Sequence, residues 1–234
     1  MKPILIAHRS GPVNFPEQTL QSCRDALASG ADMVEMDIQI TSDGNLVICH
    51  DPNALRMFGV DKLVRDMTLA EFMGLRHASD SAYCSHSLAN VVESGVEPIL
   101  FHCKITGKVM EMVTDFLHER DFDDKCVLGV QYAEDVVTVK SRSRIKTLAF
   151  MPRLEQLESF LESDTDYIRL WQAWVTPERV KMIRDAGKKC WIMAGEATAQ
   201  GVGYTTPEYM RLWQDLGVDG ILVNDVKWAM QYID

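Results

Sequence analysis

The chain has 234 residues, of which 47% are hydrophobic and 25% are charged, a globular balance that excludes an intrinsically disordered chain. It carries 34 Asp and Glu against 24 Lys and Arg. The resulting net charge of −10 argues against general electrostatic binding to nucleic acid or to an anionic membrane. This length allows one large domain or two small ones, at roughly 100–200 residues per domain.

The N-terminal region predicts neither a signal peptide nor a membrane-spanning segment. Its apolar run covers only residues 4–7, which is too short for either. The six cysteines are scattered and form no Cys-x-x-Cys pair, which favours buried free thiols over a disulfide framework. We therefore expect a cytoplasmic protein without an integral membrane segment.

Strand-like apolar runs alternate with amphipathic stretches along the chain, which is typical of an α/β protein with a parallel sheet. The expected strands cover residues 4–9, 33–39, 46–50, 98–104, 126–130, 147–151, 167–172, 190–194 and 220–224. The expected helices cover residues 20–28, 68–75, 88–93, 109–119, 154–162, 179–186 and 209–216.

Nine strands are one more than an eight-stranded barrel needs, and the Asp43-Gly44 dipeptide accounts for the surplus. Asp-Gly favours a two-residue hairpin loop, which would place Ile40 opposite Val47 and Asp37 opposite His50. Residues 46–50 would then be the returning arm of a strand that extends beyond the barrel. The pattern predicts a (β/α)8 TIM barrel with a short β-hairpin arm after strand 2, formed as a single domain by residues 1–234.

Polar side chains gather at the predicted C-terminal ends of the strands, where catalytic residues of such barrels lie. Glu35 and Asp37 share one face of the second strand because strand side chains alternate. Two carboxylates at a barrel mouth repel each other unless a divalent cation neutralises them. The alternative is a pair of solvated acids on an exposed strand. On the next strand, His102 could complete a metal shell and Lys104 could hold an anion.

Two histidines form the second part of the candidate site. His8 ends the first strand, and the hairpin register places His50 beside Asp37. Histidine titrates near neutrality and serves as a general acid or base, so the pair suits an in-line displacement at phosphorus. The alternative is two histidines that bond only to backbone carbonyls. Arg9 offers a planar charged fork suited to phosphate, or a salt bridge to Glu17 or Asp37.

The segments IAHRSGPVNFPEQTL, VEMDIQITSDGNLVICHDPNAL, FHCK and GVDGILVND resemble the glycerophosphodiester phosphodiesterase family. The resemblance spans nearly the whole chain and is most specific in its N-terminal part. It implies a metal-dependent phosphodiesterase on a barrel related to phosphatidylinositol phospholipase C. Such an enzyme cleaves glycerophosphocholine, glycerophosphoethanolamine or a similar diester to glycerol phosphate and a free alcohol.

The resemblance also implies a role for each residue that matches a family motif. His8 and His50 would be the acid/base pair, Arg9 and Lys104 the phosphate ligands, Glu35 and Asp37 the ligands of one divalent ion, and Glu17 a supporting acid. We add Trp171, at the end of the sixth barrel strand, as a second supporting residue. The implied metal is Mg or Ca.

Several positions depart from the family pattern. His102 stands where the family has Glu, and because imidazole suits transition metals better than Mg or Ca, Mn or Zn becomes an alternative. Asn224 stands where the family has Asp, Ser10 replaces Gly, and Gln18 replaces Asn. These changes leave the identity of the metal and the shape of the alcohol pocket open.

Two other classes of function remain open. A metal-dependent barrel lyase or isomerase acting on a phosphorylated sugar would use the same acids and Lys104, but it would need a glycine-rich phosphate loop that residues 217–225 do not clearly provide. A non-catalytic module that binds a phosphodiester would explain His102 and Asn224, but not the retention of both histidines. We expect a small-molecule glycerophosphodiester and no nucleic acid as partner, and we leave the oligomeric state open.

Overall fold

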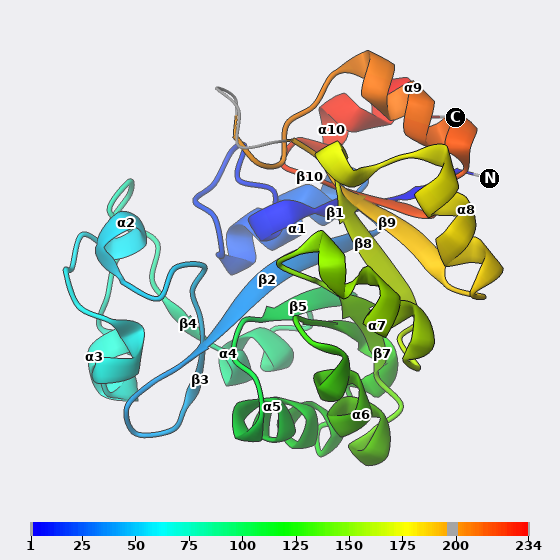
Figure 1. Ribbon diagram of the computed structural model, residues 1–234. Helices are drawn as coiled ribbons and strands as arrows, with labels where there is room; N and C mark the ends of the chain where they lie inside the picture. Colours follow the sequence, from blue (N-terminus) through cyan, green and yellow to red (C-terminus); the bar gives the residue numbers. More distant parts are fainter. Residues whose placement is uncertain (1, 196–200, 234) are drawn as a thin grey trace.

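The computed structural model describes residues 2–195 and 201–233 (Figure 1). Parallel strands pair in the order β1–β2–β5–β6–β7–β8–β9–β10 and close through a β10–β1 pairing. The barrel strands are β1 Ile4–Ala7, β2 Met33–Ile40, β5 Ile99–Cys103, β6 Cys126–Val130, β7 Lys146–Ala149, β8 Tyr167–Trp171, β9 Lys189–Met193 and β10 Gly220–Val223. The predicted TIM barrel is therefore confirmed.

Helices cover the outside of the barrel between successive strands (Figure 1). They are α1 Leu20–Ala28, α4 Leu88–Glu93, α5 Lys108–His118, α6 Ala133–Arg142, α7 Leu157–Glu162, α8 Pro177–Asp185, α9 Pro207–Leu216 and α10 Val226–Ala229. The sequence analysis did not predict α6. Its apolar face is narrow, with Val136 and Val139 as its buried hydrophobic residues, so its helical periodicity is weak.

Alternating side chains of the strands build two hydrophobic layers. One set fills the barrel interior, and the other packs outward beneath the helices, where it forms the largest core cluster. Within the barrel, fully buried residues such as Ile6, Leu100 and Leu222 each contribute about 1.5–3 kcal/mol of burial free energy. This packing fixes the strand ends that carry the site.

The hairpin after β2 has a wider loop than predicted. The Thr41 amide donates to the Asn45 carbonyl (2.9 Å), and the Gly44 amide donates to the Thr41 carbonyl (3.0 Å). Gly44 adopts a left-handed conformation (φ +81°), and the Thr41 hydroxyl donates to the Asp43 carboxylate (2.6 Å). These contacts stabilise a three-residue loop with a bulge at glycine instead of the two-residue turn.

The wider loop shifts the hairpin register by one residue. In the pairing of β2 with β3 (Leu46–Ile48), Ile40 faces Leu46, not Val47. The Cys49 amide donates to the Asp37 carbonyl (3.0 Å), so Cys49 and not His50 lies opposite Asp37. The predicted hairpin arm is present, but its predicted register is wrong.

Residues 51–97, here called the excursion, form a small lobe beside the end of β2 (cyan in Figure 1). The lobe contains α2 Leu55–Phe58, the 3-10 helix η2 Val64–Asp66, α3 Leu69–Met73 and β4 His86–Ser87, which pairs with β3, whereas α4 at the end of the excursion packs against the barrel. The lobe shares a separate hydrophobic core with the hairpin arm, formed by Val47 and Cys49 of the arm and by Ala54, Met57, Phe58, Val64, Met67 and Phe72 of the lobe. The excursion is thus a packed unit and not a loose loop.

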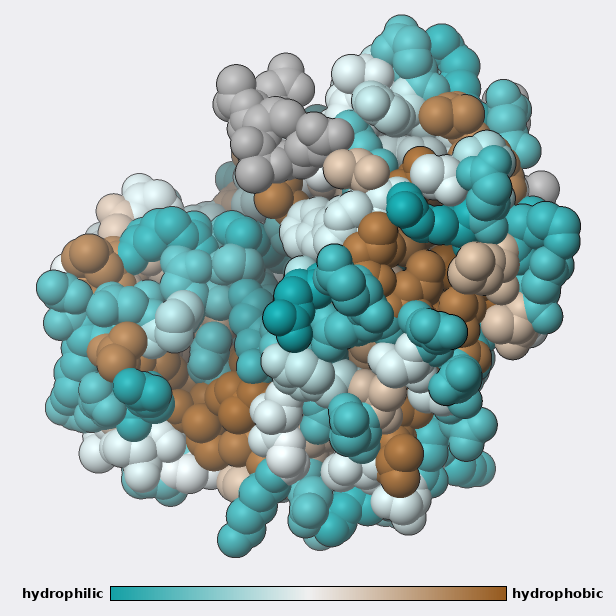
Figure 2. Space-filling view, in the orientation of Figure 1, coloured by the Kyte–Doolittle hydropathy of each residue, from teal (hydrophilic) through white to brown (hydrophobic). Residues whose placement is uncertain are grey.

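The surface in the orientation of Figure 1 is mostly hydrophilic, with a hydrophobic area where the excursion meets the helices below it (Figure 2). A shallow groove of about 180 Å³ lies between the hairpin and α5, with Leu46, Leu69 and Phe116 among its lining residues. In residues 2–195 and 201–233, no helix has both the length and the apolar character needed to cross a bilayer. All six cysteines are free thiols.

Candidate active site

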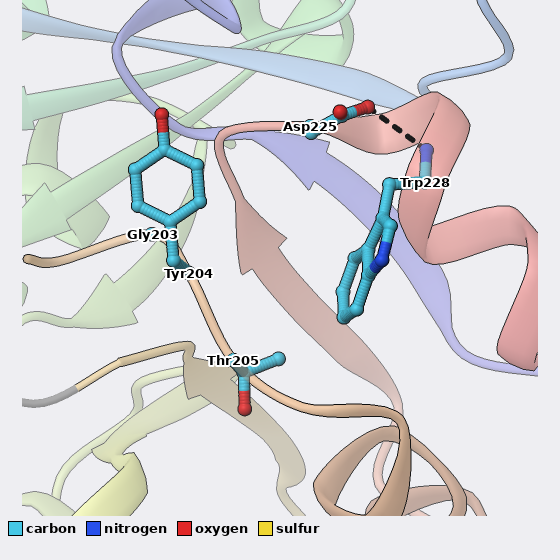
Figure 3. A pocket seen from close by; sticks show the side chains of 5 residues that line it. All are labelled: Gly203, Tyr204, Thr205, Asp225 and Trp228. Atoms are coloured by element: carbon cyan, nitrogen blue, oxygen red, sulfur yellow. Dashed lines mark hydrogen bonds between the residues drawn. The ribbon is translucent and has the colours of Figure 1, made fainter. Parts of the chain in front are cut away.

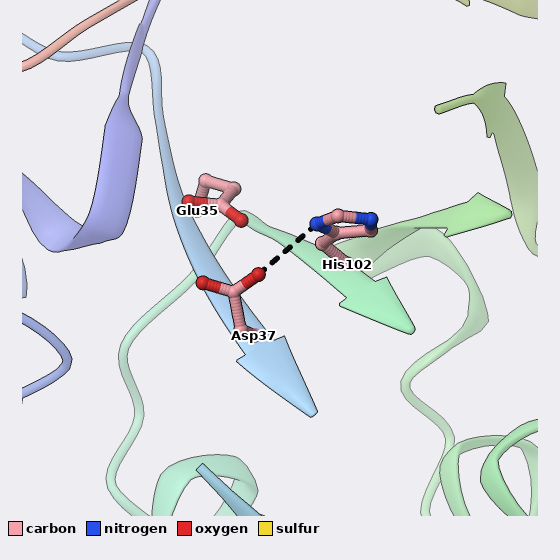
Figure 4. A group of neighbouring side chains, drawn as sticks. All are labelled: Glu35, Asp37 and His102. Atoms are coloured by element: carbon pink, nitrogen blue, oxygen red, sulfur yellow. Dashed lines mark hydrogen bonds and ion pairs between the residues drawn. The ribbon is translucent and has the colours of Figure 1, made fainter. Parts of the chain in front are cut away.

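Glu35, Asp37 and His102 form a buried cluster at one end of the barrel. Asp37 and His102 face each other in the register of β2 and β5, and Glu35 lies two residues before Asp37 on the same face. One ligand atom from each residue lies within 4.8 Å of the other two, and the residues are 1%, 1% and 9% exposed. Figure 4 shows the three side chains directed toward one another from the two strands. The structure therefore brings together all three predicted metal ligands.

Protein donors surround the carboxylate of Asp37. Its Oδ1 lies 3.1 Å from Lys104 Nζ and 3.0 Å from His102 Nδ1, and its Oδ2 accepts from Gln18 Nε2 (2.7 Å). Burial alone would raise the pKa of Asp37, but the Lys104 ammonium and the His102 ring hold it well below its usual range. Asp37 is therefore an anion at neutral pH.

Glu35 lies in a less favourable environment for a negative charge. Burial first, and then the charge of Asp37, raise the pKa of Glu35 well above its usual value. The backbone N–H of Arg9 donates to Glu35 Oε2 (2.7 Å) and offsets part of this effect. A divalent cation would remove the repulsion between the two acids.

The donor set fits a divalent cation that accepts both oxygen and nitrogen ligands. The His102 ring presents Nδ1 to Asp37 and leaves Nε2 buried without a hydrogen-bond partner. The ring also stacks on Phe150, with 3.9 Å between the centroids and 19° between the planes. Burial lowers the pKa of His102 to about 4, so the imidazole is neutral and able to act as a ligand at neutral pH.

His8 directly follows β1, at the start of a 3-10 turn, and is almost completely buried. Its Nδ1 lies 2.8 Å from Asn224 Oδ1, and Asn224 Nδ2 donates to the Val202 carbonyl (2.9 Å). Because the amide nitrogen is committed to a carbonyl, the amide oxygen accepts, and the His8 proton is on Nδ1. Burial first, and then the charge of Arg9, lower the pKa of His8 to about 3. His8 is thus a neutral imidazole with a lone pair on Nε2.

His50 is held by a different set of partners. Its Nδ1 lies 2.6 Å from Asp51 Oδ1, and its Nε2 lies 2.8 Å from Arg9 Nη2. A guanidinium only donates, so Nε2 accepts and the proton is again on Nδ1. Burial first, and then the charges of Lys104 and Arg9, hold the pKa of His50 below its usual value, and the charge of Asp37 and the hydrogen bond to Asp51 offset only part of this effect. Although the hairpin register was wrong, His50 still lies in the site, beside Arg9.

Arg9 and Gln18 take unusual backbone conformations to reach the site. Both have positive φ angles (+49° and +60°), which cost energy for residues other than glycine. Arg9 contacts Glu17 (Nη1 to Oε2, 3.2 Å), as one of the predicted alternatives stated. Gln18 donates to the Asp37 carboxylate and accepts from the Asp37 backbone N–H (3.0 Å). The sequence analysis noted Gln18 only as a departure from the family and missed this positioning role.

Lys104 and Trp171 lie where the sequence placed them. Lys104 follows β5, and its ammonium contacts both Asp37 and the His50 carbonyl (2.7 Å), so it links the cluster to the second histidine. The Trp171 ring lies over the guanidinium of Arg169, 4.3 Å from its Cζ. Trp171 therefore supports a neighbouring side chain.

Arg169 is a buried cation that the sequence analysis missed. It is 1% exposed, and its guanidinium lies between Phe150 and Trp171, with Cζ 4.6 and 4.3 Å from the rings. Burial lowers its pKa to about 9, which still leaves it charged at neutral pH. A single arginine at an inward position of an otherwise apolar strand was the signal that could have identified it.

A pocket of about 370 Å³ lies next to the site. It is lined by Gly203, Tyr204, Thr205, Asp225 and Trp228, and Figure 3 shows Tyr204 and Trp228 facing it from opposite sides. The Gly203 carbonyl accepts from the backbone N–H of Asn224 (2.8 Å), the residue that bonds to His8. The pocket is thus linked to His8 through Gly203 and Asn224, and its lining residues come from the segment before α9 and from the start of α10.

Comparisons with known proteins find sequence similarity over short segments. The chain is 41% identical over 75 residues to a glycerophosphodiester phosphodiesterase of Caldanaerobacter subterraneus, covering 32% of this chain and 31% of that protein. It is 42% identical over 67 residues to a glycerophosphodiester phosphodiesterase of Bacillus altitudinis, covering 29% and 27% of the two chains. These matches span less than a third of the relatives' own length.

Solved structures share the fold over the full barrel. The chain aligns with an Oleispira antarctica phosphodiesterase in complex with the product sn-glycerol-3-phosphate, with a TM-score of 0.82, 19% identity and coverage of 99% and 96% of the two chains. For the glycerophosphodiester phosphodiesterase of Agrobacterium tumefaciens the TM-score is 0.80, with 18% identity and coverage of 98% of each chain. The statistical model of the Glycerophosphoryl diester phosphodiesterase family matches residues 8–227.

Proposed function

Because this chain belongs to the glycerophosphoryl diester phosphodiesterase family, we propose that it hydrolyses a glycerophosphodiester to glycerol phosphate and an alcohol with the aid of a divalent metal ion. The main support is the convergence of two neutral histidines, two cations and the cluster of Glu35, Asp37 and His102 at one barrel end. The product glycerol-3-phosphate bound to a structural neighbour supports the same class of substrate.

The two histidines are the proposed acid/base pair, and their partners suggest different roles. His8 faces a neutral amide and has a pKa of about 3, so its Nε2 lone pair is available to accept a proton from the attacking hydroxyl or water. His50 is neutral in the structure and its Nε2 accepts from Arg9, so to act as an acid it must first take up a proton on Nε2 in place of that hydrogen bond, and the Asp51 carboxylate behind Nδ1 would stabilise the resulting imidazolium. We therefore assign the general base to His8 and the general acid for the leaving alcohol to His50.

Arg9 and Lys104 are the proposed phosphate ligands. Both are cationic side chains between the acidic cluster and His50, and Arg9 Nε is buried without a hydrogen-bond partner. A phosphodiester placed there would lie between the two histidines and gain charge-assisted hydrogen bonds.

Glu35, Asp37 and His102 are the proposed metal ligands. A bound divalent ion would polarise the phosphoryl oxygens and offset the charge that develops on them. The imidazole in this set favours Mn or Zn over the Mg or Ca implied by the family.

The fold supports two further proposals. We propose residues 1–234 as one domain, because the barrel runs from β1 to β10 and the excursion joins it through β3. We also propose a reducing, cytoplasmic location, which fits the six free thiols.

The test is to incubate the purified protein with glycerophosphocholine, glycerophosphoethanolamine and other glycerophosphodiesters, with Mg, Ca, Mn or Zn in turn. We expect release of glycerol phosphate that a chelator abolishes, and a fall of about 10²–10⁴ in kcat for His8→Ala. His118→Ala is the matched control, because His118 is half exposed on α5 and pairs with Asp123. If none of these diesters yields glycerol phosphate with any of the four metals, the proposal is overturned.

A further inference from the structure

Five side chains at the rim of the site form a closed ring of contacts. The Glu17 carboxylate lies between two arginines, with Oε2 3.2 Å from Arg9 Nη1 and Oε1 2.5 Å from Arg56 Nη2. The Asp51 carboxylate lies between Arg56 and His50, with Oδ2 2.5 Å from Arg56 Nε and Oδ1 2.6 Å from His50 Nδ1. The last contact joins His50 Nε2 to Arg9 Nη2 (2.8 Å). Cations and carboxylates alternate, and His50 closes the ring between Asp51 and Arg9.

Arg56 is the one member of this ring that joins the two carboxylates. Nη2 of its guanidinium contacts Glu17, and Nε of the same group contacts Asp51. Each carboxylate in turn contacts a proposed functional residue: Glu17 contacts the phosphate ligand Arg9, and Asp51 contacts the general acid His50. A planar fork can satisfy both acids at once, which a single ammonium cannot do with the same geometry.

The excursion places Arg56 in this position. Arg56 lies on α2, where the next two residues, Met57 and Phe58, are buried in the hydrophobic core beneath the helix. Met57 Sδ lies 3.7 Å from Cys49 Sγ, which anchors α2 next to the hairpin arm that carries His50. The side chain of Arg56 is 49% exposed, so its contribution acts through the two acids and not through the buried metal cluster.

We propose that Arg56 is a positioning residue for the phosphodiesterase reaction, which orients His50 through Asp51 and Arg9 through Glu17. The inference rests on the proposed function for its kinetic consequence, but the ring itself is testable without substrate. Without Arg56, Glu17 and Asp51 lose the cation that they share. The His50 imidazole and the Arg9 guanidinium then lose their fixed orientations.

The kinetic test compares Arg56→Gln and Arg56→Lys with the wild type. Loss of an outer partner of this kind typically costs about 10–100-fold, which we expect for kcat of Arg56→Gln, with a smaller change in KM. Arg56→Lys should recover part of kcat because it keeps the charge but not the fork. Arg65→Gln, an exposed arginine of η2 outside the ring, is the matched control and should behave like the wild type.

The second readout is the Nδ1–H proton resonance of His50 in the NMR spectrum. The 2.6 Å contact with Asp51 should place this signal far downfield, and it should move upfield or broaden in Arg56→Gln. A double-mutant cycle with Asp51→Asn should show strongly non-additive losses, because both changes break the same link. Thermal unfolding of each variant separates loss of orientation from loss of fold.

The outcomes are distinguishable. If Arg56→Gln keeps the wild-type kcat and His50 signal, or if Arg65→Gln shows equal losses, the inference is wrong. If Arg56→Gln fails to fold, Arg56→Lys and Asp51→Asn decide by the same two readouts. A wild-type protein that hydrolyses no diester overturns the proposed function, while the His50 resonance still reports whether Arg56 holds the ring.

Discussion

The half of the site built on the barrel strands differs in burial and in charge from the half built on the hairpin arm and the excursion, here called the excursion half. His8 and the acidic cluster are at most 9% exposed, and His8 bonds to a neutral amide. His50 and Asp51 have side chains that are 25% exposed and belong to a ring of ion pairs. The first half is held by packing in a low-dielectric interior, whereas water and salt screen the second half.

This difference indicates which changes the site tolerates. Unpairing a buried charge costs several kcal/mol, whereas an exposed ion pair is worth about 1 kcal/mol or less. We therefore expect substitutions that unpair a buried charge in the barrel half to damage stability and activity together, and those in the excursion half to affect activity more than stability.

Asp37→Asn should have the largest effect and tests the comparison directly. The change keeps the size of the side chain but removes the buried partner of an ion pair and leaves the Lys104 ammonium without its counter-charge, so we expect a loss of about 3 kcal/mol of unfolding free energy. The loss of a metal ligand should also lower kcat by about 10³-fold or more, within the range of catalytic contributions. Asp51→Asn is the counterpart in the excursion half. Urea unfolding that shows equal destabilisation by both variants would contradict the distinction.

Gly129→Ala sharpens the account of the barrel half. A Cβ at Gly129 would lie 2.8 Å from Phe150 Cδ2 and would push this ring away from its stack on His102. We expect about a tenfold loss of Mn or Zn affinity, measured by calorimetry, because groups that orient a ligand tune its metal. Gly74→Ala, at the end of α3, serves as the control. Unchanged metal affinity in Gly129→Ala would argue against a role for the stack.

Asn224→Asp would make the partner of His8 resemble the partner of His50. A carboxylate 2.8 Å from Nδ1 favours the imidazolium, and so raises the pKa of His8 from about 3. Arg9 and His50 oppose protonation of His8 and Asp37 favours it, and all three remain in the variant. The acidic limb of the kcat/KM profile should therefore move upward by about one pH unit or more. A profile that stays in place would contradict the assignment of His8 as the base.

Glu35→Gln should have the smallest effect and a stabilising sign. The folded-state pKa of Glu35 is raised above its unfolded value, so its ionisation lowers stability as the pH rises through this interval. In metal-free buffer the variant should match the wild type near pH 3 and exceed its stability at pH 7. Thermal unfolding across this pH range measures the difference. A variant less stable than the wild type at pH 7 would show that the negative charge of Glu35 is stabilising.

Much of the fold followed from local patterns in the sequence. Strand-like apolar runs that alternate with amphipathic stretches predicted the eight barrel strands, because both signals depend on residues close in the chain. The predicted meeting of Glu35, Asp37 and His102 needed one further rule, that the C-terminal ends of parallel strands converge at one end of a barrel.

The hairpin shows where local patterns failed. Asp43-Gly44 predicted a two-residue loop, but the bonds of Thr41 to Asp43 and Asn45 stabilise a three-residue loop. Both turns suit this dipeptide, and side-chain hydrogen bonds decide between them. The backbone amide of Leu69, far along the chain, also donates to Asp43 (3.0 Å) and helps to fix the loop.

The sequence by itself determined the barrel, the carboxylates on one strand face and the residues that match the family motifs. Only the tertiary structure decided that Gln18 hydrogen-bonds to Asp37 and that Arg169 lies between Phe150 and Trp171. It likewise decided that Arg56 joins Glu17 and Asp51 in one ring. It also decided the positions of the protons on His8 and His50, through Asn224 and Arg9. The physical reason is that these contacts join residues distant in the chain, whose energies depend on burial and geometry that no local pattern encodes.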